Sequence, residues 1–278
     1  MNASHDKGFT ILELLVVIAI IGILATVILA SLANTRSIAA TTASLEFDRH
    51  VYHALGDTLQ AAWLFDECGS AGATVVQDSS GNNINGTIYG TPSWDTSTYA
   101  PSSKCALDFN GTSNYVNFPT TPNIDNGSFT VSSWIKRLRT SWSANEDVVS
   151  KNWPIIFLRS SNYVYCEFPK LVTSLGLTSV RKITDNNWHN IVCTYDVTTN
   201  VRNIYIDGTL DNTGIAAGPL SGSNSSPWQL SNSVSYGTNF LYGVIDDVRV
   251  YSSAITAEAV GKLYAEGLEK HKLLFARN

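Results

Sequence analysis

The chain has 278 residues, of which only 15% are charged, and its formal net charge at pH 7 is −5. Such a sparsely charged, slightly acidic chain has no basic surface, which argues against nucleic acid as a partner. The long portion after residue 60 has room for one large all-β unit.

The N-terminal portion combines a short polar segment with a long apolar run. The run from Leu14 to Ala33 is interrupted only by one glycine, one threonine and one serine. As a helix rising ~1.5 Å per residue, it could cross the ~30 Å hydrocarbon layer of a bilayer. Glu13 directly precedes the run, and an unpaired carboxylate at that depth is costly, so its presence predicts a partner from another copy of the chain.

Two other interpretations of this segment compete. An ordinary secretory signal peptide would have a shorter apolar core followed by a small-residue cleavage site. A plain single-span anchor would fit the length but would leave Glu13 and the Gly8-Phe9 junction unexplained.

A leader ending in Gly8, then Phe9, then Glu13 at the fifth position after the junction resembles the type IV pilins and pseudopilins over roughly the first 35 residues. The resemblance implies cleavage between Gly8 and Phe9 by a prepilin peptidase, and N-methylation of Phe9. It implies that Glu13 pairs with the new amino group of a neighbouring subunit during filament assembly. It also implies a single pass through the inner (cytoplasmic) membrane before assembly, with the head outside, on a pilus, pseudopilus or cell surface.

The predicted organisation therefore begins with a leader, residues 1–8, and a pilin-type helix, residues 9–60, whose membrane part is about 9–33. From residue 34 to about residue 59, apolar side chains recur at helical spacing, which predicts that the helix continues. Gly56-Asp57 is expected to mark its end.

From Ala61 the pattern changes to short runs rich in Val, Ile, Tyr, Phe and Trp, separated by Gly, Asn, Ser and Pro. Such a series predicts a mainly β fold, a two-sheet antiparallel sandwich. Asp207-Gly208 predicts a hairpin turn, and Thr256 is expected to cap a short C-terminal helix that ends at Tyr264. The predicted strands are Ala62–Phe65, Thr87–Tyr89, Ala106–Phe109, Tyr115–Phe118, Phe129–Ile135, Ile155–Leu158, Tyr163–Phe168, His189–Tyr195, Asn203–Ile206 and Gly243–Tyr251.

Residues 61–265 resemble the concanavalin A-like, laminin G-like jelly roll, and residues 266–278 remain as a C-terminal tail. The segments that carry the resemblance, in this order, are Ala62–Asp66, Asp78–Thr87, Ala106–Gly111, Tyr115–Phe118, Phe129–Ile135, Trp188–Val192, Asn203–Gly208 and Gly243–Tyr251.

The four cysteines, Cys68, Cys105, Cys166 and Cys193, all follow the apolar run and match no metal-binding spacing. In an oxidising compartment they would form two disulfides. The preferred pairing is Cys68 with Cys105 and Cys166 with Cys193, because each pair is close in the chain. Buried free thiols are the alternative.

Calcium is the predicted cofactor. Strand alternation would place Asp246 on the face of Val244, Val248 and Val250, where a carboxylate needs a cation or several donors. Laminin G-like domains often bind calcium at the rim of the sandwich, which suggests a site formed by Asp78 and Asp246 with oxygens from Asn83 or Asn85. The alternative is that Asp78 caps a turn and Asp246 accepts backbone N–H groups.

Some aromatic side chains are candidate ligand contacts, because their faces can stack on sugar rings. These candidates are Trp142, Trp153, Tyr163, Trp228 and Tyr236. Trp142, Trp153 and Trp228 fall in loop-like stretches.

Enzymatic chemistry is not expected. The Glu-x-Asp-x-x-Glu set of lectin-like glucanases does not occur, and no Gly-x-Ser-x-Gly elbow accompanies His189. The sequence predicts a minor or filament-displayed pilin-like subunit whose head binds a glycan or a surface protein. A structural pseudopilin of a type II secretion or DNA-uptake machine is the alternative, and a polysaccharide-degrading enzyme is a remote one.

Overall fold

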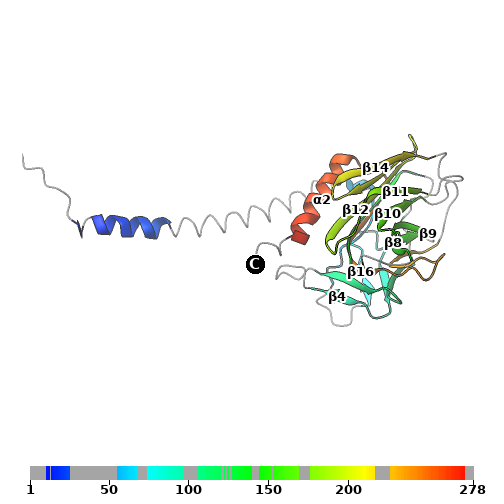
Figure 1. The fold of residues 1–278 in the computed structure, drawn as a ribbon, viewed down its shortest axis with the longest axis horizontal. Coiled ribbons are helices and arrows are strands. Elements are labelled where there is room, and N and C mark those ends of the chain that lie inside the picture. Colours follow the sequence, from blue (N-terminus) through cyan, green and yellow to red (C-terminus); the bar gives the residue numbers. More distant parts are fainter. Residues whose placement is uncertain are drawn as a thin grey trace, which may run out of the picture. The chain divides into compact units, whose positions relative to one another are not determined.

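The computed structural model describes residues 11–12, 14–25, 55–67, 74–96, 105–119, 122, 124, 127–139, 144–151, 153–168, 176–216 and 226–272 (Figure 1). The chain divides into two compact units, Met1–Tyr52 and His53–Asn278. The first contains a helix over residues 14–25. The second, the head, contains the β structure and is described by itself below.

The head is a sandwich of two eight-stranded sheets, and every strand pairing in them is antiparallel. Sheet A has the order β14-β13-β12-β7-β16-β5-β4, with β1 paired to β16 as well. Its strands are β1 (Leu59–Trp63), β4 (Ser93–Asp95), β5 (Ala106–Asn110), β7 (Phe129–Arg137), β12 (Trp188–Asp196), β13 (Val201–Ile206), β14 (Thr209–Ile215) and β16 (Tyr242–Tyr251).

Sheet B has the order β11-β10-β9-β8-β15-β6-β3-β2. Its strands are β2 (Val75–Val76), β3 (Gly86–Tyr89), β6 (Tyr115–Phe118), β8 (Glu146–Lys151), β9 (Trp153–Leu158), β10 (Tyr163–Glu167), β11 (Gly176–Lys182) and β15 (Trp228–Leu230).

The predicted mainly β sandwich is confirmed, and each predicted strand corresponds to one in the structure. The sequence pattern missed several others, of which β8 is the most informative. Its residues Glu146-Asp-Val-Val-Ser-Lys151 are mostly polar, yet all six are buried. Tertiary packing places this strand in the middle of sheet B. Its polar composition alone would predict a surface loop.

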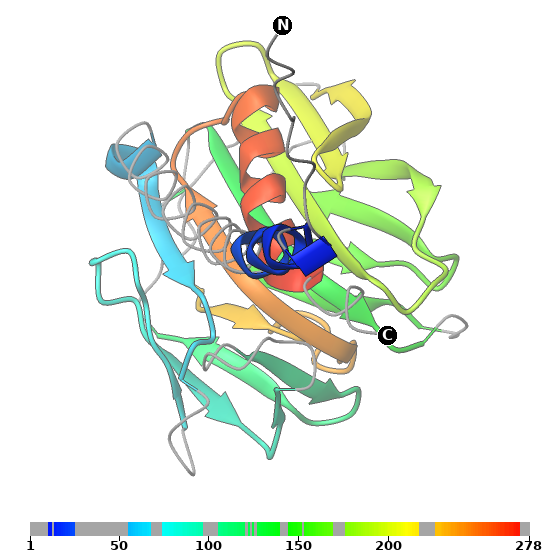
Figure 2. The ribbon, with the colours of Figure 1, turned by 90° about the vertical axis from the view of Figure 1, so that its left-hand side faces the viewer.

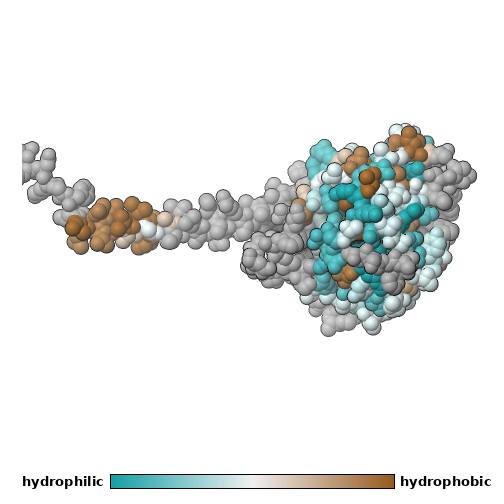
Figure 3. All heavy atoms as spheres, in the orientation of Figure 1, coloured by the Kyte–Doolittle hydropathy of each residue, from teal (hydrophilic) through white to brown (hydrophobic). Residues whose placement is uncertain are grey.

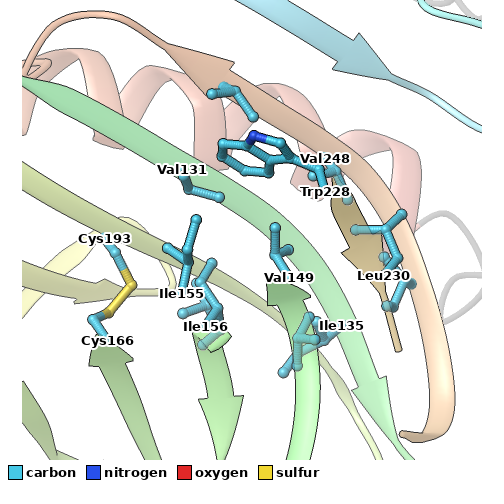
Figure 4. Close-up of a cluster of buried hydrophobic side chains, with 14 of the residues drawn as sticks. Val131, Ile135, Val149, Ile155, Ile156, Cys166, Cys193, Trp228, Leu230 and Val248 are labelled. Atoms are coloured by element: carbon cyan, nitrogen blue, oxygen red, sulfur yellow. A yellow bond between two sulfur atoms is a disulfide. The ribbon is translucent and has the colours of Figure 1, made fainter. Parts of the chain in front are cut away.

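The core lies between the sheets, where Val131 and Ile135 of β7 face Val149 of β8 and Ile156 of β9 (Figure 4). At another part of the core, the ring of Trp63 stacks on Phe118 with 3.8 Å between ring centroids. The Trp63 indole N–H donates to the carbonyl of Ile84 at 2.7 Å. Burying these rings contributes apolar area that holds the two sheets together.

The predicted Cys166–Cys193 disulfide is present and joins β10 of sheet B to β12 of sheet A (Figure 4). It closes a sequence separation of 27 residues, which in the chain-entropy model corresponds to a stabilisation of about 3–4 kcal/mol. Cys105 is also disulfide-bonded. Cys68, its predicted partner, lies outside the described residues.

The C-terminal helix α2 (Ala257–Lys272) covers the outer face of sheet A, lying against β12 (Figures 1 and 2). The Thr256 hydroxyl accepts a hydrogen bond from the Ala259 N–H at 3.2 Å, which confirms the predicted N-cap. Tyr264 of α2 stacks on Trp134 of β7, with ring centroids 5.6 Å apart. The helix continues past its predicted end at Tyr264, so the predicted tail begins as helix.

The predicted hairpin between β13 and β14 is also present. Asp207 and Gly208 both have positive φ, 55° and 73°, as a two-residue type I′ turn requires. At the other end of the predicted long helix, Gly56–Thr58 forms a short 3-10 turn that leads into β1. Residues 26–54, where the helix was expected to continue, lie outside the described part of the chain.

Candidate functional site

The N-terminal helix is apolar on all sides. Its Leu, Ile and Val side chains over residues 14–25, together with Ile11 and Leu12, are each between 45% and 82% exposed, and the helix forms a continuous hydrophobic surface (Figure 3). A helix that is apolar all round is stable only where lipid or other protein surrounds it. Within the described residues, no helix meets the length and apolarity that a membrane crossing requires. Gly8, Phe9 and Glu13 lie outside the described residues.

The turn that follows β2 holds Asp78 through four hydrogen bonds. Its Oδ1 accepts from the backbone N–H groups of Ala62 and Ser80, both at 2.9 Å. Its Oδ2 accepts from the Ile84 N–H at 2.9 Å and from the Ser80 hydroxyl at 2.8 Å. The Asn85 side-chain oxygen accepts from the Asp78 N–H. These oxygens therefore already have donors, which favours the turn-capping alternative.

Calcium binding at this turn stays a prediction. The Asp78 oxygens that would bind the ion already accept hydrogen bonds from the protein. Asn83 adopts the left-handed conformation, with φ 57°, as turn residues of this type commonly do. In the described part of the chain, no group of three or more His, Cys, Asp or Glu side chains is placed to hold a metal ion.

The predicted orientation of Asp246 is wrong because β16 contains a bulge. The register with β7 shifts between Asp246 and Arg249, and Asp247 has φ 47°. The extra residue reverses the alternation, so that Ile245, Val248 and Val250 belong to the core while Asp246 faces the side covered by α2. Asp246 accepts a hydrogen bond from the Asp247 N–H at 2.7 Å.

Arg249 forms two ion pairs beside α2. Arg249 lies 2.8 Å from Asp247 and 2.8 Å from Glu266 of α2. Burial alone would lower the pKa of Arg249, but the two carboxylates hold it well above its usual value. The arrangement ties α2 to sheet A and supplies the buried Asp247 with a counter-charge.

The structure describes the side chains of three of the five aromatic candidates, Trp228, Tyr163 and Tyr236. Trp228 lies in β15 and is fully buried in the core, so its expected position in an exposed loop is wrong. Trp142 lies outside the described residues, and so does the side chain of Trp153. Tyr163 is half-buried in β10, with the Lys182 ammonium 5.0 Å from its ring centroid. Tyr236 is 48% exposed.

The outer face of sheet B carries a row of side chains that sequence reasoning missed. Asp147 of β8 pairs with Phe157 of β9, which pairs with Tyr165 of β10. The neighbouring row, Val149 with Ile156 and Cys166, belongs to the core. Because successive residues of a strand point to opposite faces, Asp147, Phe157 and Tyr165 point away from the core. All three are nevertheless buried, with exposed fractions of 0%, 7% and 7%.

The same face continues at the other end of sheet B with a second aromatic pair. Tyr89 of β3 lies opposite Tyr115 of β6, and their rings are stacked with centroids 4.7 Å apart and an interplanar angle of 3°. Their strand neighbours Ile88 and Val116 pack in the core, so the tyrosines point outward. Tyr89 is 44% exposed.

Residues Ser231–Leu241 form a lobe that is pinned to β8. The Ser231 N–H donates to the Val148 carbonyl at 3.1 Å, and the Asp147 N–H donates to the Asn239 carbonyl at 2.7 Å. Within the lobe, a tight turn bonds the Gly237 N–H to the Ser233 carbonyl at 2.8 Å. This turn presents Tyr236 to solvent, so the exposed ring is held by an ordered backbone.

Two carboxyl groups on this side of the sheet have strongly perturbed pKa values. Burial raises the pKa of Asp147 to about 7, although Ser233 and Asn239 act to lower it. Burial, and then repulsion from Asp147, raise the pKa of Glu167 of β10 to about 7. Burial also raises the pKa of Tyr236, with repulsion from Glu167 and Asp147 as further causes. Glu167 lies two residues after Tyr165 on β10, and the lobe that carries Tyr236 is bonded to Asp147 through the Asn239 carbonyl. We call Asp147, Glu167 and Tyr236, together with Phe157 and Tyr165, the acidic aromatic patch.

These raised pKa values predict the sign of a pH dependence. Both carboxyls bind protons more tightly in the folded head than in the unfolded chain, so they favour folding less as the pH rises from about 4.5 to about 7. Asp147→Asn should therefore flatten the loss of stability between pH 5 and pH 8. Urea unfolding of the two proteins at several pH values measures the slopes, and equal slopes would contradict the raised pKa of Asp147.

Both ring nitrogens of His189 on β12 contact carboxylate groups. Its Nδ1 lies 3.0 Å from Asp207 and its Nε2 lies 2.8 Å from Asp185. Burial acts to lower the pKa of His189, but the two carboxylates raise it overall. Both ring nitrogens thus contact carboxylates, an arrangement that differs from a Ser-His-Asp triad, where one nitrogen faces the serine.

The head is therefore a two-sheet antiparallel sandwich with one face covered by a helix. The family model for the concanavalin A-like lectin/glucanases superfamily matches residues 110–261, more than half of the chain. The chain belongs to this superfamily. The prokaryotic N-terminal methylation motif matches residues 3–29, so the chain also carries the pilin-type signal of a membrane-anchored precursor.

Solved structures with a similar fold include binding domains. The binding domain of Paraclostridial Mosquitocidal Protein 1 is 16% identical, with a TM-score of 0.59 over 75% of this chain and 52% of that one. The binding domain of botulinum neurotoxin DC, in complex with rat synaptotagmin II, is 16% identical, with a TM-score of 0.59 over 76% and 52%. The chain spans about half the length of these toxin domains.

A third similar structure matches almost over its full length. It is domain 4 of AbnA, an extracellular GH43 arabinanase from Geobacillus stearothermophilus, in complex with arabinotriose. It is 19% identical, with a TM-score of 0.53 over 74% of this chain and 98% of that one. At these identities the likeness shows the fold alone. The comparison with curated proteins finds no match.

Proposed function

We propose that this protein is a pilin-like subunit, a minor or filament-displayed one, whose head binds a glycan or a surface protein outside the cytoplasmic membrane. The observation that carries the proposal is the presence, in one chain, of a prokaryotic methylation motif and a concanavalin A-like domain. The fold relative solved with arabinotriose supports a carbohydrate ligand, and the one solved with synaptotagmin II supports a protein ligand.

The assembly part of the proposal follows from the N-terminal helix. Its fully apolar surface needs lipid before assembly and the helices of other subunits afterwards. The proposed partners are therefore the membrane, a prepilin peptidase that cleaves between Gly8 and Phe9, and other pilin subunits. The proposed location is the inner membrane, followed by a pilus, pseudopilus or cell surface.

A binding screen with the head alone tests the ligand part. Residues 53–278 contain the compact head unit, so this fragment can be applied to arrays of oligosaccharides and of surface proteins, with and without a calcium chelator. We expect saturable binding to at least one oligosaccharide class. Binding to no glycan or surface protein, combined with retention of secretion-machine components, would replace the proposal by a structural pseudopilin. Release of sugar would indicate an enzyme instead.

A further inference from the structure

Three asparagines of this chain are followed directly by glycine, and this dipeptide allows a side-chain amide to react with the backbone that follows it. The three are Asn85, Asn110 and Asn126, of which the first two lie in the described part of the chain. Glycine has no Cβ, so its backbone nitrogen can approach the preceding side-chain amide closely. The fold gives Asn85 and Asn110 different surroundings.

The Asn110 side chain folds back over the residues that follow it. Asn110 ends β5, is exposed, and starts the turn that leads to β6. Its Oδ1 accepts hydrogen bonds from the backbone N–H groups of Thr112 and Ser113, both at 3.0 Å, and of Asn114 at 3.2 Å. Its Nδ2 donates to the Ser113 hydroxyl at 3.1 Å. Three donors therefore polarise the amide carbonyl, and a hydroxyl group lies beside the amide nitrogen.

Gly111 completes this arrangement. Its φ is 72°, in the left-handed region that favours glycine. A Cβ at this position would lie 2.6 Å from the Arg139 Nη2 and 2.8 Å from the Tyr242 Cβ. Neither the space nor the backbone conformation suits a larger residue, so the turn requires glycine directly after Asn110.

The surroundings of Asn85 differ, although Gly-Thr follows both asparagines. The Asn85 Oδ1 accepts from the backbone N–H of Asp78, which precedes it in the chain, at 2.8 Å. Gly86 is buried in β3 and pairs with Val76 of β2. A backbone nitrogen held in a strand cannot turn toward the preceding side chain without disturbing the strand pairing. Asn85 therefore serves as a control within the same chain.

We propose that Asn110 is a site of spontaneous deamidation in the folded head, a modification that is independent of what the head binds. The Gly111 nitrogen attacks the Asn110 Cγ and forms a C–N bond, while the bond from Cγ to Nδ2 breaks and ammonia leaves with the proton of the Gly111 N–H. The negative charge that develops on Oδ1 is stabilised by the three N–H donors, as in an oxyanion hole. Water then opens the cyclic imide to aspartate or isoaspartate. In the aspartate product, the new carboxylate keeps these donors and its charge strengthens the hydrogen bonds.

Peptide mapping by mass spectrometry tests the proposal on the full-length protein, kept in detergent and sampled over time in mildly alkaline buffer. We expect the peptide that contains Asn110 to convert about tenfold faster than the peptide that contains Asn85. Ser113→Ala removes the hydroxyl beside the leaving nitrogen, so it should slow the conversion of Asn110 several-fold and leave that of Asn85 unchanged. Thermal unfolding verifies that the variant is folded.

The same measurement on urea-unfolded protein separates the effect of the turn from that of the dipeptide. Without the turn, Asn85 and Asn110 should convert at similar rates, because the same two residues follow each of them. Equal rates in the folded protein, or an Asn110 peptide that keeps its amide, would overturn the proposal. A difference that persists in urea would also overturn it, since the rate would then depend on local sequence and not on the folded turn.

Discussion

Glu146→Ala should destabilise the head by about 3–5 kcal/mol, because it leaves a buried arginine without its counter-ion. Glu146 of β8 and Arg137 of β7 are both fully buried and meet at 2.5 Å, so that the ion pair bridges the two sheets inside the sandwich. Glu146 also accepts a hydrogen bond from the Tyr242 N–H at 3.1 Å. Urea unfolding of the wild-type and variant heads measures the difference.

Two further variants isolate the cause. Glu258→Ala removes a carboxylate from an exposed pair with Lys262 on α2 and should change stability little, because water screens such pairs. The double variant Arg137→Met/Glu146→Leu removes both charges and should regain most of the lost stability. If Glu146→Ala unfolds at the same urea concentration as the wild type, the pair does not hold the sheets together.

Glu13→Ala should leave the protein processed and membrane-bound but absent from filaments. The physical reason is the cost of placing the new α-amino group, with a reference pKa near ~8, in a low-dielectric layer without a counter-charge. Counting the subunit in sheared filaments by immunoblot, together with N-terminal sequencing of the membrane fraction, measures both steps.

Glu46→Ala is the matched control for this assembly prediction, because it removes a carboxylate that lies past the apolar run. It should enter filaments like the wild type. Normal incorporation of Glu13→Ala would argue against the pairing role. A purified mature protein that still begins at Met1 would contradict cleavage at Gly8-Phe9 and, with it, the assembly mechanism.

Local sequence signals were sufficient to predict the elements whose structure depends on one short segment. Asp207-Gly208 predicts its turn because a type I′ turn needs two residues with positive φ and nothing distant. Thr256 predicts the start of α2 because a cap bond reaches only three residues along the chain. Alternating apolar runs such as Tyr115–Phe118 predict strands for the same reason.

Local sequence signals did not predict the β-bulge in β16 or the buried polar strand β8. The extra residue at Asp247 in β16 reverses the side to which Asp246 points, and no local composition signals it. Glu146 and Asp147 occupy a fully buried strand because Arg137 of β7 neutralises the first and the lobe at Ser231–Leu241 surrounds the second. Phe157 and Tyr165 each lie between two core residues of their strand. This alternation was the sequence signal that could have placed them on the outer face of sheet B.

The amino-acid sequence by itself determined the assembly signal, the mainly β head and the positions of its principal strands, because these depend on periodicity and turn chemistry. It also favoured the Cys166–Cys193 pairing, because the two cysteines are close in the chain. Only the tertiary structure decided which side chains share a face. Asp147 and Glu167 come from β8 and β10, and burial in the folded head raises the pKa of both carboxyl groups. The set of side chains that shares a face is a property of strand register, and register is set by the whole sandwich.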